Sequence, residues 1–210
     1  MSAVEMSPQA FYTERVPAQW NQTLADQEAA AAGDDAAGKV LEGMRGVDVT
    51  VRVDVEGDGG GTFFLNVREG AMAAGSAATR PPLLTLIQDR RAFEKIASEA
   101  GDSALGLLGG LSGFVGDFKL TKSRVENLAG VAGCLRLEVT GDDGFAFRVH
   151  FGDGPVPDAP DTEIQVGAEV YADLREGRLD PQNAFMGGQL DVSGDLQIAM
   201  SLALAALSPE

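Results

Sequence analysis

The clearest structural signal in the chain is the alternation of apolar and polar residues in CLRLEVTGDDGFAFRVHF, residues 134–151. Apolar side chains occupy every second position over 135–139 and again over 145–151. A period of two residues sends alternate side chains to opposite faces of a β-strand, so one face of each run is apolar. The turn at 141–144 separates the two runs, and the stretch therefore predicts a hairpin with one buried face.

The same alternation occurs once more, earlier in the chain. Valine occupies every second position over 47–55, a glycine-rich turn follows at 57–61, and a second alternating run covers 63–67. Downstream of each hairpin the order loop, strand, helix, strand, helix recurs. In the first case the last strand is expected to carry Phe114, Phe118 and Leu120. We expect an internal duplication of two units, 46–130 and 131–210, behind a helical segment at 1–45. The two units are expected to pack as a pseudo-dimer.

The charge of the chain excludes several classes of partner. The 210 residues include 32 acidic and 16 basic side chains, a formal net charge of -16. A field this negative repels nucleic-acid phosphates and the anionic surface of a membrane. Residues 131–210 hold 14 of the acids and 4 of the bases, a net of -10, so most of the imbalance lies in the second unit. No apolar run is long enough to span a membrane and no secretory signal is visible, so a cytoplasmic protein is expected.

Candidate catalytic and metal-binding residues are few. Cys134 is the only cysteine and His150 the only histidine, so a disulfide, a cysteine zinc site and a multi-histidine metal site are not expected. His150 falls on the polar face of its strand and is expected to be solvated, whereas Cys134 is expected to serve packing. The acids are spread over polar faces and turns, and none forms an evident acid–base pair. We expect no cofactor and favour a protein that is not an enzyme.

The C-terminal residues 195–207 predict a helix that is apolar on two sides. Leu196 and Met200 belong to one stripe, while Ile198 and Leu202 belong to a second. A helix that only covers a core keeps one polar face. This pattern therefore favours a helix with a sheet on one side and an apolar ligand or partner chain on the other. A plain core helix and a dimer seam remain open alternatives.

The segment GRLDPQNAFMGGQLDVSGDL, residues 177–196, resembles the sterol carrier protein 2 family. The family pattern has Asn or Asp followed by Pro-Gln-x-Ala-Phe, then a short strand, then Gly-Asp or Gly-Asn before an apolar helix. The resemblance extends over about residues 131–207. Residues 46–130 look like a degenerate copy that lacks the Pro-Gln-x-Ala-Phe run. The resemblance implies an α+β fold, with a curved, mostly antiparallel, five-stranded sheet covered by helices on one face.

The resemblance also implies a tunnel between the sheet and the C-terminal helix that holds a fatty acid, a sterol or a similar apolar molecule. The ligand-binding residues it implies come from one hairpin strand, the Pro-Gln-x-Ala-Phe turn, the following strand and the last helix: Phe147, Val149, Phe185, Met186, Leu190, Val192, Leu196 and Met200. Strand positions that are usually basic in the family are Gln189 and Asp191 here, so binding of a CoA phosphate and docking to an anionic membrane are not expected.

Three classes of function follow from the sequence. The favoured one is a non-catalytic carrier for a lipid, a sterol or another apolar small molecule, with an uncharged cargo or one presented by a protein partner. The second is a duplicated scaffold that acts by protein–protein contact without a ligand. The third is an enzyme that acts on an apolar substrate. The sequence leaves open the identity of the ligand, whether one or both units bind, and the oligomeric state.

Overall fold

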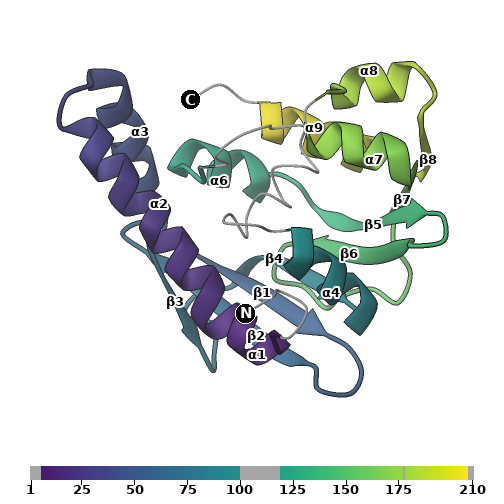
Figure 1. Ribbon diagram of the computed structural model, residues 1–210, viewed down its shortest axis with the longest axis horizontal. Helices are drawn as coiled ribbons and strands as arrows, with labels where there is room; N and C mark the ends of the chain where they lie inside the picture. The colour runs from purple at the N-terminus through teal and green to yellow at the C-terminus, as the bar shows by residue number, and fades with distance from the viewer. Residues whose placement is uncertain (1–5, 100–118, 177, 208–210) are drawn as a thin grey trace.

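The computed structural model describes residues 6–99, 119–176 and 178–207 (Figure 1). It confirms an α+β fold, in which helices cover an eight-stranded open sheet of order β3-β2-β1-β4-β6-β5-β7-β8. The strands are β1 Val49–Val55, β2 Gly61–Arg68, β3 Ala71–Gly75, β4 Pro82–Gln88, β5 Gly133–Thr140, β6 Phe145–Phe151, β7 Thr162–Gly167 and β8 Leu190–Gly194. The helices are α1 Pro8–Ala10, the π-helical turn η2 Phe11–Arg15, α2 Val16–Ala31, α3 Asp35–Arg45, α4 Arg90–Glu99, α6 Lys122–Ala129, α7 Ala168–Arg175, α8 Pro181–Met186 and α9 Leu196–Leu207.

The sheet is mostly antiparallel, as expected. The pairings β1–β4 and β5–β7 are parallel, and the other five are antiparallel. Successive pairings along the strands β3-β2-β1-β4-β6 are antiparallel, antiparallel, parallel and antiparallel. The strands β4-β6-β5-β7-β8 repeat this order of pairings. The resemblance implied a five-stranded sheet, whereas the described residues form one sheet of eight strands, four from each predicted unit. The two sets share β4 and β6, so the hydrogen-bonded sheet is continuous through the middle of the chain.

The N-terminal helices form because their ends are capped and one face is apolar. The Ser7 side chain accepts a hydrogen bond from the Ala10 N–H, and the Asp34 side chain accepts from the first turn of α3. Trp20 of α2 is buried and donates its indole N–H to the Gly70 carbonyl, 2.7 Å away, which ties the helix to the turn between β2 and β3. Residues 6–45 are therefore helical, as the sequence predicts, and they cover the end of the sheet that begins with β3 (Figure 1).

The edge strand β3 was not predicted from the sequence. It reads AMAAG, and alanine and glycine have weak strand preference, so neither propensity nor alternation marks it. Asn21 of α2 pairs with its outer edge: the Asn21 amide donates to the Met72 carbonyl at 2.9 Å and accepts from the Met72 N–H at 2.9 Å. A side chain that occupies both groups blocks the edge against pairing with another chain.

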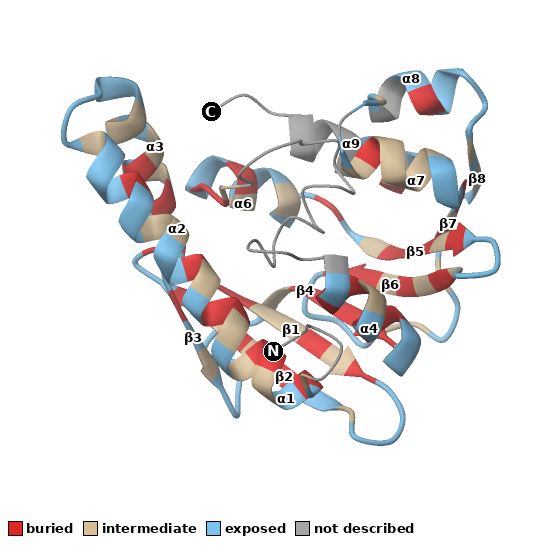
Figure 2. Cartoon of the chain, in the orientation of Figure 1, coloured by how far each residue is buried: buried red, intermediate tan, exposed pale blue. Residues whose placement is uncertain are grey.

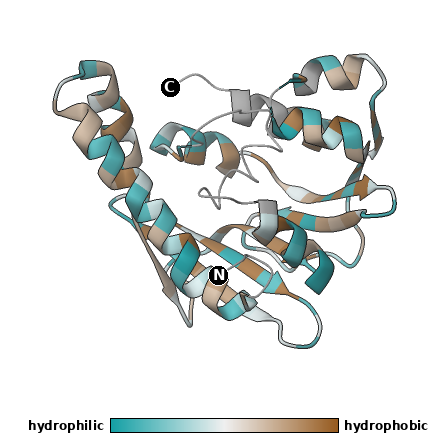
Figure 3. Ribbon diagram, viewed as in Figure 1, coloured by the Kyte–Doolittle hydropathy of each residue, from teal (hydrophilic) through white to brown (hydrophobic). Residues whose placement is uncertain are grey.

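The core lies between the sheet and the helices. Figure 3 shows hydrophobic residues alternating with hydrophilic ones along the strands, and Figure 2 shows which of these positions are buried. On the helix-facing side Val53, Leu86, Val149 and Leu135 are all buried, and the register makes them neighbours across β1, β4, β6 and β5. Aromatic side chains fill the layer above. Among them Phe11 contacts Phe93 edge to face, with ring centroids 5.5 Å apart.

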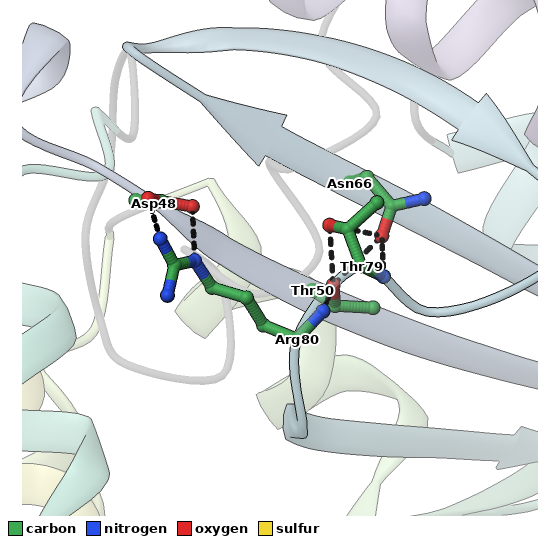
Figure 4. A network of polar contacts seen from close by, with 5 residues as sticks. All are labelled: Asp48, Thr50, Asn66, Thr79 and Arg80. Carbon is green, nitrogen blue, oxygen red and sulfur yellow. Dashed lines mark hydrogen bonds and ion pairs between the residues drawn. The ribbon is translucent and has the colours of Figure 1, made fainter.

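The opposite face of the sheet carries polar networks where loops fold over it. In Figure 4 Asn66 of β2 accepts hydrogen bonds from Thr50 and Thr79, with its Oδ1 2.7 Å from the Thr50 hydroxyl and 3.0 Å from the Thr79 N–H. Arg80 donates its backbone N–H to Thr50 and forms an ion pair with Asp48. This ion pair lowers the pKa of the Asp48 carboxyl, mainly through the hydrogen bond from Arg80. The network fixes the loop that leads from β3 into β4.

Most of the other elements also agree with the sequence. Both hairpins are present, and so are the strand and helix expected after the first hairpin (β4 and α4) and the four elements expected after residue 161 (β7, α7, β8 and α9). The predicted strand with Phe114 and Phe118 lies outside the described residues. Leu120 at its end is buried but belongs to the non-strand segment that leads into α6.

Candidate ligand-binding site

One row of helix-facing side chains crosses the sheet through the predicted site. The register aligns Phe147 of β6 with Leu137 of β5, Leu137 with Ile164 of β7, and Ile164 with Val192 of β8. Three strand spacings separate the two ends of this row, roughly 14 Å. Phe147 and Leu137 are buried, whereas Ile164 and Val192 are half-buried. The row therefore runs from the core toward the β8 edge as a continuous apolar strip.

The segment before β8 folds as the helix α8, where the sequence analysis expected a turn. Asp180 caps it by accepting a hydrogen bond from the Asn183 N–H at 3.0 Å, and Pro181 occupies the first turn, where its missing N–H costs nothing. Ala184 points inward and is fully buried. As a consequence, Phe185 and Met186 project outward, with 46% and 78% of their surfaces exposed.

The junction between β8 and α9 explains the Gly-Asp pair of the motif. Gly194 has φ +85°, a conformation that favours glycine, and a side chain there would collide with the Asp161 backbone carbonyl. Asp195 caps α9, since its Oδ1 accepts from the Gln197 N–H at 2.8 Å. Thr162 adds a buried hydroxyl that donates to the Asp195 carbonyl at 2.6 Å. These contacts fix the start of α9 against the end of β7.

The helix α9 packs on the sheet through one of its two apolar stripes. Ile198 is buried and lies directly over Gly133, so close that a Cβ on Gly133 would be 2.5 Å from its Cδ1. Leu196 and Met200 belong to the other stripe and are 47% and 61% exposed. At the start of α9 the sheet thus covers Ile198 of one apolar stripe and leaves Leu196 and Met200 of the other exposed, which is one of the arrangements the sequence pattern favoured.

The eight predicted ligand-binding residues fall into three groups by burial. Phe147 and Val149 are buried in the core, Leu190 and Val192 are half-buried on β8, and Phe185, Met186, Leu196 and Met200 are exposed on α8 and α9. The register brings Phe147 and Val192 into one row, and Leu190 follows in the next helix-facing row of β8. The four exposed residues are the exposed large apolar side chains among those the structure describes.

Cys134 and His150 lie away from these residues, on the opposite face of the sheet. They are direct partners across β5 and β6, and both are buried. The expectation that His150 is solvated is wrong, because the proline-rich loop after β6 folds over this face and Arg148 donates to its Pro157 carbonyl at 3.2 Å. Burial raises the pKa of the Cys134 thiol, so this thiol is a poor nucleophile. Among the described residues, no cluster of three His, Cys, Asp or Glu side chains could hold a metal ion.

Sequence reasoning missed a buried polar pair next to Phe147. Gln88, the last residue of β4, aligns with Phe147 of β6 on one side and with Val55 of β1 on the other. Its amide donates to the hydroxyl of Tyr12, which η2 brings from the N-terminal segment. Gln88 is 1% exposed and Tyr12 is 4% exposed. The available signal was weak, because β4 has apolar residues on both faces and Gln88 only continues the inward positions of Leu84 and Leu86.

Comparison with known proteins identifies part of the chain. Residues 115–206 match the family model of the SCP-2 sterol transfer family. Among curated proteins none matches. No helix of the described residues has the length and apolar character that would let it cross a membrane.

Solved structures of related proteins align with parts of the chain. Sterol carrier protein 2 like 2 from Aedes aegypti is 26% identical, with 35% of this chain and 72% of that chain covered and a TM-score of 0.29. Sterol carrier protein 2 from Yarrowia lipolytica, in its apo form, is 18% identical, with 50% and 88% covered and a TM-score of 0.32. The ubiquinone synthesis protein UbiJ-SCP2 is 25% identical, with 53% and 95% covered and a TM-score of 0.31.

The family match begins before α6 and ends within α9, so it contains all of β5–β8 and the Asp180 and Gly194-Asp195 positions described above. Residues 115–206 of this chain are therefore similar to the SCP-2 sterol transfer family.

Proposed function

We propose that the protein is a non-catalytic carrier for an uncharged apolar molecule, a lipid or a sterol, which lies against the exposed side of α9 and the half-buried β8 edge of the sheet. The observation that carries the proposal is the open stripe of α9. Leu196 and Met200 remain exposed although Ile198, on the same helix, is buried against the sheet. Soluble proteins rarely leave apolar side chains gathered and uncovered without a binding role.

The match of residues 115–206 to the model of the SCP-2 sterol transfer family supports the same function. The half-buried end of the apolar row, Ile164 and Val192, supplies a second apolar surface on the sheet side. A cargo covered by both surfaces would gain about 0.8 kcal/mol for each methylene removed from water. Ten methylenes would contribute on the order of 8 kcal/mol, of which association and ordering remove a large part, so micromolar affinity is expected.

The charge of the chain supports an uncharged cargo. The net charge is -16, and the family segment contributes strongly to it. Three carboxylates, those of Asp180, Asp191 and Asp195, flank β8 and the helices beside it, and all three are on exposed residues. An anionic head group would be repelled at this end of the sheet.

We also propose that the chain arose by duplication, with the second unit as the binding unit. The repeated order of strand pairings supports this, and so do equivalent details of the two hairpins. Arg52 pairs with Asp54 on β1 at 2.9 Å, and Arg136 pairs with Glu138 on β5 at 2.6 Å. Each residue of the second pair lies 84 positions after its counterpart in the first. The same offset relates Val55 and Val139, the valines before the two hairpin turns.

A thermal-shift titration of delipidated protein tests the carrier function. Hexadecanol, cholesterol and palmitate are added separately, and the melting temperature is recorded against ligand concentration. A molecule that binds only the folded state raises the melting temperature, and the increase grows with the logarithm of its concentration once this exceeds the dissociation constant. We expect a concentration-dependent increase with at least one neutral lipid. If none of these lipids changes the melting temperature, the carrier function is excluded.

A protein-contact scaffold is the second candidate, and the exposure of Met186 favours it. At 78% exposed, this side chain contacts little of the folded chain and is open to a partner protein. A scaffold would show no lipid response in the titration above and would lose its partner on Met186→Gln. A carrier would keep its lipid response in the same variant, or lose only part of it.

A further inference from the structure

The helix α8 presents two large apolar side chains, Phe185 and Met186, from a backbone that is fixed at both ends. The Asp180 side chain caps its start, and at its end the Gln189 N–H donates to the Ala184 carbonyl at 2.9 Å. Ala184 is fully buried, while Phe185 and Met186 are exposed. A partner that covers these two side chains therefore meets a surface whose backbone is already ordered, which lowers the entropic cost of association.

Phe185 and Met186 suit a protein partner better than a small apolar molecule. Small molecules commonly bind in concave sites that cover most of their surface. Met186 is 78% exposed and projects from its helix, so a small molecule placed on it would stay largely in water. Aromatic and methionine side chains are enriched at the centres of protein interfaces, where a partner surface can enclose them.

The basic residues nearest to α8 in the sequence are already paired. Residues 179–210 contain no lysine or arginine, and the last bases before them are Arg175 and Arg178. Arg178 forms an ion pair with Asp173 at 2.7 Å, and Arg175 forms one with Glu176 at 3.6 Å. The charges of both bases are therefore balanced by acids of their own segment.

Three carboxylates beside α8 have no such balance. Asp180 caps α8, Asp191 lies on the edge strand β8, which contacts α8, and Asp195 caps α9. All three residues are exposed, and none of them forms an ion pair with another described residue. Phe185 and Met186 thus lie in a segment whose unpaired charges are all negative.

This charge excludes most other occupants of the surface. A second copy of the chain would bring the same three carboxylates and a further net charge of -16 against them. Nucleic-acid phosphates and an anionic membrane surface would be repelled in the same way. A protein face with lysine and arginine around an apolar centre is complementary, because its cations meet the carboxylates while its centre covers Phe185 and Met186.

We propose that Phe185 and Met186, with the carboxylates of Asp180, Asp191 and Asp195, form a docking surface for a basic protein partner. The contact face of this partner has an apolar centre and a rim of lysine and arginine. We call these five residues the α8 surface. The inference rests on the protein-contact function proposed above and adds the chemistry of the partner. A carrier can have such a surface as well, since its cargo lies against α9 and β8 instead.

Binding of three labelled peptides, followed by fluorescence anisotropy, tests the α8 surface. The first is an amphipathic helix of leucine and lysine, the second has the same composition in an order without an apolar face, and the third has glutamate in place of every lysine. The wild type should bind the first peptide at least tenfold more tightly than the second, and should not bind the third. Phe185→Ser combined with Met186→Gln should lower the affinity for the first peptide about tenfold and leave that for the second within twofold.

A second set of variants tests the rim at physiological ionic strength, where charges more than about 8 Å away are largely screened. Asparagine in place of all three carboxylates of the α8 surface keeps the helix caps and should lower the affinity for the first peptide about tenfold. The matched control removes the same charge from three exposed acids in the first half of the chain and should keep the affinity within about twofold: Asp34→Asn, Asp35→Asn and Asp58→Asn.

Melting curves show whether each variant is folded, and Met186→Gln alone serves as the apolar test if the double variant unfolds. The docking surface is excluded if the apolar variant binds the first peptide as the wild type does, or if the control weakens binding as much as the change at the α8 surface. A dimer in sedimentation that Met186→Gln dissociates would make the occupant a second copy, which also overturns the inference. A lipid titration of the wild type is a separate readout, and its failure contradicts the carrier function alone.

Discussion

Gln88 and Phe147 face each other across the pairing of β4 with β6, the pairing that joins the two halves of the sheet. Both side chains are almost fully buried, at 1% and 2% exposure. One residue belongs to the first predicted unit and the other to the second, so their contact is part of a core that the two units share. Folding and binding are therefore expected to involve both halves of the chain.

Phe147→Ala should destabilise the whole protein and not only its second half. Deleting a buried phenylalanine ring typically costs about 3–5 kcal/mol of unfolding free energy. The single tryptophan, Trp20, lies in the N-terminal segment and reports on the first half by fluorescence. In urea unfolding, the midpoint read by Trp20 fluorescence and the one read by circular dichroism should decrease together. Phe185→Ala, at an exposed position, should change both by little. A Trp20 transition that does not move would contradict a shared core.

Gly133→Ala should displace α9. The new methyl group would meet Ile198, and the residue has φ +120°, which a side chain rarely adopts. We expect a loss of about 1–3 kcal/mol in unfolding free energy, together with weaker lipid binding. Gly167→Ala is the control, since Gly167 has open space around its Cβ position. Equal melting temperatures for the two variants would show that α9 does not dock through Ile198.

Met200→Gln should weaken lipid binding without lowering stability. Met200 is 61% exposed in the absence of cargo, so its replacement removes little buried surface from the folded protein. A cargo that covers this side chain would lose roughly 1.5 kcal/mol or more of apolar contact, about a tenfold change in affinity. The measurement is a lipid titration beside a melting curve. Ser201→Gln, on the next and also exposed residue, provides the matched control. If the lipid affinity of Met200→Gln is unchanged, the exposed side of α9 does not contact the cargo.

Tyr12 should make the protein sensitive to alkaline pH. Its folded-state pKa is raised by burial, so in the unfolded state Tyr12 ionises first, near pH 10. The stability contribution is complete below pH 10 and is lost as the pH rises, by up to about 1.4 kcal/mol per pH unit. Urea unfolding between pH 9 and pH 11 should show this decrease in the wild type and in Tyr171→Phe. In Tyr12→Phe the decrease should be smaller, and an identical decrease in all three proteins would place Tyr12 in contact with water.

The sequence predicted those parts of the fold that local patterns encode. Alternation located β1, β2, β5 and β6, and the apolar pattern over residues 195–207 located α9. The strand β3 was missed because its AMAAG sequence carries no strand signal and it is held by β2 and by Asn21. The burial of His150 was missed because the proline-rich loop that covers it, directly after β6, carries no alternating pattern.

The sequence predicted which residues form the candidate site but not how they are arranged in space. The motif identified Phe185, Met186, Leu196 and Met200, while the register alone aligned Phe147 with Val192. The place of Gln88 beside Phe147 could not be predicted from the sequence, because it depends on the pairing of β4 with β6. Pairing between distant strands is determined by the whole core and not by either strand.

Native mass spectrometry of the protein as purified, under conditions that preserve non-covalent complexes, tests the carrier function most directly. The carrier function predicts a mass above that of the 21.8 kDa chain by one neutral lipid, with this lipid released on collisional activation. After delipidation, added hexadecanol should restore one bound molecule per chain. A chain that carries no lipid as purified and takes up none of the added lipid would contradict the account.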